Sequence, residues 1–219
     1  MTGTYQEMQD DIENDLGDSG VNTSALRQSK ILAAIRMYQK ERFWFLETTD
    51  TFATVDGTAT YDLPTDIRTQ DHRLRMTVDT EKVPLVYRPV EWMNNNFSST
   101  TTGQPQAFTI EAGLIRLGPI PDDAYTITRT YFAELTVLSG GSDTNAWLTH
   151  GEELIRQCAL RQLHEIDRNF EMAALHGANE QAALARLRRQ SAEIMSPGRM
   201  NTSHVADMVN PSVFNINVG

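Results

Sequence analysis

The stretch RFWFLETTDTFATVDGTATYDLP, residues 42–64, decides how this chain is predicted to fold. It opens with the aromatic run Phe43, Trp44 and Phe45, where a helical pattern of apolar residues ends. Threonine, valine and tyrosine then lie on both sides of Asp56-Gly57, a pair that favours tight turns between strands because such turns need positive φ. We therefore expect a hairpin over residues 49–63, ended by a proline that cannot donate to a strand ladder.

Helical patterns lie before this switch. Thr4 and Glu7 have the spacing of a capping box, and apolar residues then recur at helical spacing as far as Gly17. A second helix is expected from Thr23 or Ser24 to about residue 42.

Helical patterns return near the other end of the chain. Thr149 and Glu152 repeat the capping-box spacing and predict a third helix, which ends near Ile166. A fourth helix, ended by the breaker at residues 196–198, should bury one apolar stripe. That predicted stripe consists of Met172, Leu175, Ala178, Ala182, Leu187 and Ile194.

Between the helices the patterns predict strands at residues 72–78, 83–87, 107–111, 114–117 and 124–133, with one helical turn near residues 91–93. The predicted fold class is α+β: an antiparallel helical bundle from the N- and C-terminal helix pairs, with an inserted antiparallel β module and an extended C-terminal tail. The expected domains are residues 1–46 plus 145–197 as the bundle, 47–144 as the β domain, and 198–219 as the arm.

The arm has an unusual composition for a chain end. Its apolar residues include an alternating run at the very end, which is typical of a strand with one buried face. We expect an arm that adds to another chain, with a floppy terminus as the alternative. The candidate partner-binding residues are Val205, Met208, Val209, Val213, Phe214, Ile216 and Val218.

Charge and composition exclude several classes of protein. The net charge of −10 disfavours wrapping of nucleic acid, and no stretch is long and apolar enough for a membrane span. The polar, acidic start of the sequence is unlike a secretory signal or transit peptide. Six acids precede the first basic residue, Arg27, whereas Arg186, Arg188 and Arg189 cluster late. These are either solvated helix faces or surfaces of opposite charge that meet between subunits.

Catalytic motifs for phosphate binding, metal proteolysis and serine hydrolysis are not found, so no catalytic, cofactor or metal site is predicted. His150, Glu153 and His164 are too widely spaced on one helix to share a metal. Cys158 falls on an apolar stripe and is interpreted as a core residue. Phe43, Trp44, Phe45 and Trp147 are interpreted as the packed joint between bundle and β module, with a ligand platform as the alternative.

An ordered set of short motifs runs along residues 4–195. It comprises TYxE at 4–7, AIR at 34–36, RFWF at 42–45, YDLP at 61–64, TGQP at 102–105, LGPIP at 117–121 and NAWL at 145–148. In this order the motifs resemble the head-to-tail adaptor (connector) proteins of short-tailed bacteriophages.

That resemblance implies a structural virion protein of the neck, made in the host cytoplasm and without cofactors. It implies a homo-oligomeric, dodecameric ring that joins the portal to the tail nozzle and continues the channel for double-stranded DNA, without sequence-specific binding. The β domain would face the nozzle and tail fibre proteins, and the arm would dock on the portal. The alternatives are another tail subunit, such as a nozzle or fibre-attachment protein, and a cell-wall-acting enzyme using loop acids such as Asp62 and Asp66.

Overall fold

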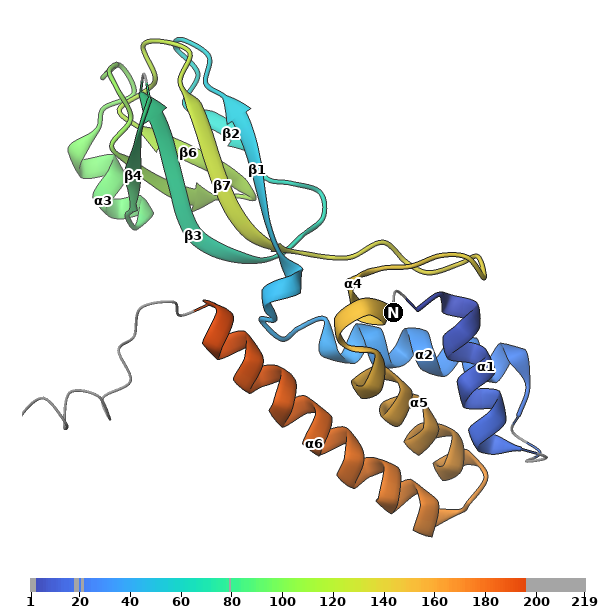
Figure 1. Cartoon of the computed structure of the whole chain (residues 1–219). Coiled ribbons are helices and arrows are strands. Elements are labelled where there is room, and N and C mark those ends of the chain that lie inside the picture. Colours follow the sequence, from blue (N-terminus) through green and yellow to red (C-terminus); the bar gives the residue numbers. More distant parts are fainter. Residues whose placement is uncertain (1–2, 18–19, 21, 79, 196–219) are drawn as a thin grey trace, which may run out of the picture.

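The computed structural model describes residues 3–17, 20, 22–78 and 80–195, and the side chains of residues 69–72 lie outside that description. Long helices form one half of the molecule and a curled sheet forms the other (Figure 1). The helices are α1 (Tyr5–Leu16), α2 (Ser24–Tyr38), α3 (Val90–Asn96), α4 (Ala146–His150), α5 (Glu152–Ile166) and α6 (Phe170–Met195), with a short 3-10 helix η1 (Trp44–Leu46). The strands are β1 (Glu47–Ala53), β2 (Thr60–Asp62), β3 (Ile67–Val78), β4 (Glu81–Tyr87), β5 (Ala107–Glu111), β6 (Leu114–Gly118) and β7 (Thr126–Ala133).

Helix α1 forms as its sequence predicts. The Thr4 hydroxyl accepts from the backbone N–H of Glu7, and the Glu7 carboxylate accepts from that of Thr4 at 2.7 Å, which completes the capping box. The apolar residues at helical spacing are buried, and Gly17 ends the helix with a φ of 56°. The buried face of α1 packs against α2 and α5, and α5 also packs against α6.

The sheet has seven strands in the order β1-β7-β3-β4-β5-β6-β2. Its pairs are antiparallel except for β4 and β5, which are parallel. The sheet is so strongly curled that its two edge strands approach each other, with the rings of Phe52 and Tyr61 5.0 Å apart. The curl encloses a core of its own, formed by Leu74, Met76, Leu85, Phe108, Ile115, Leu117 and Ile127.

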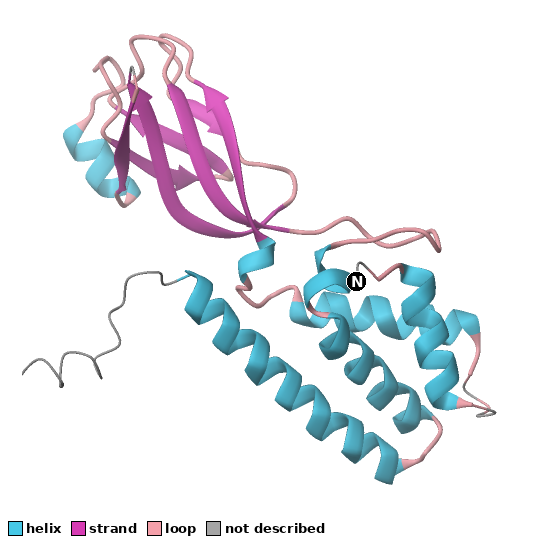
Figure 2. Ribbon diagram, in the orientation of Figure 1, coloured by secondary structure: helices cyan, strands magenta, loops and turns pink. Residues whose placement is uncertain are grey.

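The predicted fold class is therefore wrong. The protein is a mixed α/β structure with a curled, half-barrel sheet that contains a parallel pair, rather than a helical bundle with an inserted antiparallel β module (Figure 2). The parallel pair arises because the chain passes from β4 through α3 and a loop before it enters β5, and such a crossover lets two strands run in the same direction.

The predicted hairpin over residues 49–63 is also wrong. Gly57 takes the expected positive φ of 74°, but β1 pairs with β7 and β2 pairs with β6, at opposite edges of the sheet. Six residues separate β1 from β2, too many for a two-residue turn to hold them in register. The pairs β3–β4 and β5–β6 and the long strand β7 are confirmed.

Two helix boundaries differ from the prediction. Helix α2 ends at Tyr38, so the aromatic run belongs to a separate 3-10 turn. Asn145 caps α4 and Gly151 precedes α5, so Thr149 is not the cap. Helix α5 ends at Ile166, as predicted, and that side chain is 46% exposed.

Of the stripe predicted for α6, Leu187 alone is buried, so the helix turns a largely different face inward. Leu175 and Ile194 are exposed, whereas a set that includes three polar side chains is buried. That set is Ala173, His176, Glu180, Ala183, Leu184, Leu187 and Ser191. None of the helices in the described part of the chain has the length and apolar character that a membrane crossing requires.

Candidate assembly surfaces

The aromatic joint lies where η1 connects the helices to β1. The ring of Phe43 stacks on Phe45 at 5.4 Å, and both meet the indole of Trp147 edge-on, at 5.6 and 5.0 Å. Trp44 packs on Phe45 at 5.0 Å. Through these ring contacts the structure brings together all four residues predicted for the joint. Two of them, Trp147 and Phe43, are fully buried.

The returning chain forms the second half of this connection. Phe132, near the end of β7, and Leu138, after that strand, both belong to the core of the helical half. The Asp143 carboxylate accepts from the backbone N–H groups of Gly140 and Ser139, at 2.7 and 2.8 Å, which lowers its pKa. The carbonyl of Asp143 accepts from the backbone N–H of Tyr5 at 2.9 Å. The segment between β7 and α4 is thereby tied to the start of α1.

A polar network crosses the helical core. The buried Glu180 carboxylate accepts from the Tyr38 hydroxyl and, at 2.5 Å, from Nε of Arg161. Burial acts to raise the pKa of Glu180, but the bonds from Arg161 and Tyr38 hold it below its ordinary value. Burial, with the Glu180 charge, raises the pKa of the Cys158 thiol to about 11. Cys158 is fully buried, as predicted, and a thiol with so high a pKa is a poor nucleophile.

The residues weighed for chemistry are not brought together. His150 packs on Phe45 at 5.5 Å, whereas His164 stacks on His176 at 5.2 Å, deep between α5 and α6. Asp66 accepts from the Tyr131 hydroxyl at 3.0 Å, and burial together with that carboxylate raises the pKa of Tyr131 to about 12. Within the described ranges, no three His, Cys, Asp or Glu side chains are grouped so that they could hold a metal ion.

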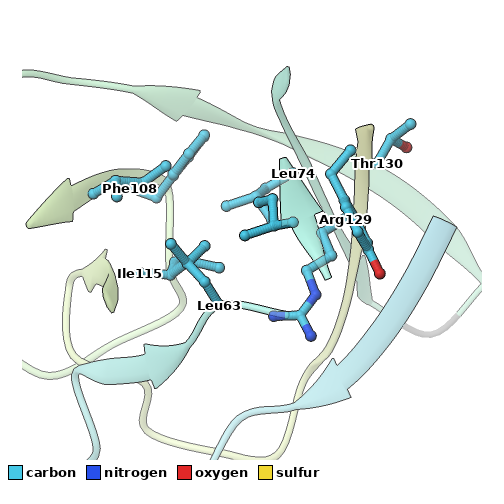
Figure 3. Close-up of a pocket in the computed structure, with 9 residues that line it drawn as sticks. Leu63, Leu74, Phe108, Ile115, Arg129 and Thr130 are labelled. Carbon is cyan, nitrogen blue, oxygen red and sulfur yellow. The ribbon is translucent and has the colours of Figure 1, made fainter. Parts of the chain in front are cut away.

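The interior of the sheet is filled by side chains. A cavity of ≈ 20 Å³ remains between Leu63, Leu74, Phe108 and Ile115, with Arg129 alongside (Figure 3). That volume holds about one water molecule. The Arg129 guanidinium closes the region by donating to Asp50 at 2.5 Å and to the carbonyl of Asp62 at 2.8 Å.

The outer face of the sheet carries a surface that the sequence analysis missed. Six side chains line a hollow of ≈ 240 Å³ there, which we call the basic hollow: Thr49, Arg73, Arg75, Lys82, Thr128 and Thr130. The sequence does contain a pattern that indicates this basic surface. Arg73 and Arg75 alternate with Leu74 and Met76, and the period of two in a strand places the two arginines on the same face.

The residues predicted for the C-terminal arm, from Val205 to Val218, lie outside the described residues.

Comparison with known families is informative over most of the chain: the family model described as SU10 adaptor protein matches residues 3–201. Comparison with curated proteins found no match.

Proposed function

The chain belongs to the SU10 adaptor protein family of phage head-to-tail adaptors, and from this premise we propose that it forms the ring joining the portal to the tail nozzle. Membership makes it a structural protein of the virion neck that contacts other virion proteins. The finer proposal is a dodecameric ring, assembled from chains made in the host cytoplasm, that continues the channel for double-stranded DNA. No catalytic activity is part of it.

The observation that carries the proposal is the family match over residues 3–201. The two separate cores support it further, because one lies among the helices and the other inside the sheet. We propose that residues 1–46 with 145–197 build the ring and that residues 47–144 project toward the nozzle and the tail fibre proteins. In this proposal the joint of Phe43, Trp44, Phe45 and Trp147 fixes the angle between the two units.

The C-terminal arm is proposed to dock on the portal. A chain ending at residue 198 should keep its helical content and melting temperature, since the described cores lie before that point. It should no longer co-purify with the portal. A full-length control with Phe214, Ile216 and Val218 all changed to serine tests the apolar side chains without shortening the chain.

Full portal occupancy by the truncated chain would contradict the docking role. Electron microscopy of the portal-bound assembly tests the ring itself. A twelve-fold ring against the portal is the expected result, whereas a six-fold assembly at the distal end would indicate a nozzle subunit instead.

A further inference from the structure

The basic hollow is built by strand register. Thr49, Thr130 and Arg73 are aligned across β1, β7 and β3, and Thr128 and Arg75 form the next row. Figure 1 shows these three strands side by side within the sheet. The intervening residues, such as Leu74, Met76 and Ile127, are buried in the sheet core, so the rows that form the hollow face outward.

The charges in the hollow are only partly balanced. Arg73 donates to Glu47 at 2.6 Å. Arg75 and Lys82 are exposed and make no hydrogen bond or ion pair with any part of the chain that the structure describes. Guanidinium, ammonium and threonine hydroxyl groups are all hydrogen-bond donors, so their convergence suits a ligand that carries anionic oxygens.

A matching anionic surface lies on α1. Its outward side chains include five acids, of which Glu13 pairs with Arg27 and Asp15 with Arg156. Among the residues that the structure describes, Asp10 accepts from Gln6 alone and Asp11 makes no ion pair. Because α1 packs against α2 and α5 in the helical half, its acids and the basic hollow lie on different parts of one chain (Figure 1).

We propose that the basic hollow binds the carboxylates of Asp10 and Asp11 on α1 of a second copy of this chain. The contact joins two different surfaces, so it is head-to-tail, and head-to-tail contacts close into rings when the rotation permits. This inference rests on the proposed function, since it adds to the adaptor ring a contact between the β domain of one copy and the helical unit of the next. A nucleic-acid phosphate has similar oxygen chemistry, but a net charge of −10 repels DNA over a long range.

Charge reversal with complementation tests the contact. Arg75→Glu with Lys82→Glu should weaken self-association about tenfold or more, because reversal replaces attraction with repulsion. Asp10→Lys with Asp11→Lys should do the same. An equimolar mixture of the two double variants should assemble again, with the copies alternating, and so should a single chain carrying all four changes. Mass photometry and sedimentation velocity, alone and with the portal, give the copy number, and circular dichroism shows that each variant is folded.

A charge-matched comparison variant is Arg186→Glu with Arg189→Glu, which makes the same charge change on the exposed face of α6 and tests whether that helix supplies the contact instead. Rings that persist in the Arg75 and Lys82 variant, or a mixture that fails to reassemble, would overturn the inference and leave the adaptor function standing. Loss of rings in the α6 control alone would place the contact on α6 and overturn it too. A wild type that is monomeric both alone and on the portal would count against the proposed function itself.

Titration with a short DNA duplex tests whether a nucleic-acid phosphate, rather than a second copy of the chain, occupies the basic hollow. We expect the wild type and the Arg75 and Lys82 variant to bind the duplex equally weakly. Binding by the wild type that is lost in that variant, with rings intact, would identify a phosphate site and overturn the inference.

Discussion

Glu180 shows how a single charged residue can hold three helices together. Its carboxylate is 2% exposed and reaches Tyr38 on α2 and Arg161 on α5. Burying a charge is costly unless partners compensate it, and here both carboxylate oxygens have donors. The network therefore links α6 to both α2 and α5 through one carboxylate.

Glu180→Leu should lower the free energy of unfolding by about 3–5 kcal/mol, because it leaves Arg161 and Tyr38 without their buried acceptor. Urea unfolding followed by circular dichroism measures the change. The control is Glu165→Gln, which removes the other carboxylate bound to Arg161, at 2.7 Å, from a half-exposed site. That control should cost about 1 kcal/mol or less, and equal losses in the two variants would contradict the assigned role of burial.

His176 makes stability depend on pH. It lies against His164, accompanied by Asp15 of α1 and by Arg156 and Glu153 of α5, and its Nδ1 is 2.7 Å from the Gln157 side-chain oxygen. Because that oxygen can only accept, Nδ1 carries a proton. Burial, with the neighbouring His164, lowers the pKa of His176 below its ordinary 6.5. This histidine therefore binds a proton more readily in the unfolded chain than in the folded one. The free energy of unfolding falls as the pH drops below the pKa that His176 has in the unfolded chain.

The free energy of unfolding should thus decrease between about pH 7.5 and about pH 5.5. His176→Gln keeps a donor for Gln157 and removes the titration, so its curve should be flatter over this range. Urea denaturation at a series of pH values measures both slopes. Parallel curves for the wild type and the variant would show that another group is responsible.

At the scale of elements, α6 shows why a helix can form as predicted and still present an unexpected face. Its buried side carries His176, Glu180 and Ser191, whose polarity hides the stripe from a search for apolar periodicity. Leu175 and several alanines create a competing apolar pattern on the exposed side. The neighbouring helices α2 and α5, which supply partners for the polar groups, determine which side is buried.

Leu184→Ala should lower the free energy of unfolding by about 2–5 kcal/mol, because it opens a cavity beneath a residue that is 6% exposed. Leu175→Ala, at a position 52% exposed, should change it by about 0.5 kcal/mol. Chemical denaturation of this pair compares the same substitution on opposite faces of one helix. A larger loss at Leu175 would mean that the buried face has been misassigned.

For the whole molecule, we expect the joint to control whether the helices and the sheet move as one body. Trp147 is fully buried and contacts the rings of both Phe43 and Phe45. The two connecting segments, η1 and the chain after β7, both end in the helical core. A double connection with a shared aromatic centre resists bending better than a single linker does.

Trp147→Ala should lower the free energy of unfolding by about 3–5 kcal/mol, because it removes the centre of the joint. It should also broaden the distance distribution from small-angle X-ray scattering. Trp147→Phe keeps a ring and provides a milder variant if the alanine chain fails to fold. The control, Trp92→Ala, removes an indole that is 36% exposed on α3 and should leave the distribution unchanged. An unaltered distribution in both Trp147 variants would exclude a role for this residue in rigidity.

Local chemistry made several features predictable from the sequence alone. The Thr4 capping box, the glycine end of α1, the β3–β4 and β5–β6 pairs and the burial of Cys158 each depend on residues close together in the chain. The ordered motifs likewise sufficed to identify the family, because they are a property of sequence order.

Only the tertiary structure decided which elements meet. The sequence around Asp56-Gly57 predicts a turn, but the longer ladder with β7 takes β1 to one edge of the sheet, while β2 pairs with β6 at the other. The same holds for the buried face of α6 and for the rows that place Arg73 and Arg75 beside the threonines of β1 and β7. The physical reason is common to all three. Local preferences act over a few residues, whereas strand partners and buried charges are selected by contacts between residues far apart in the chain.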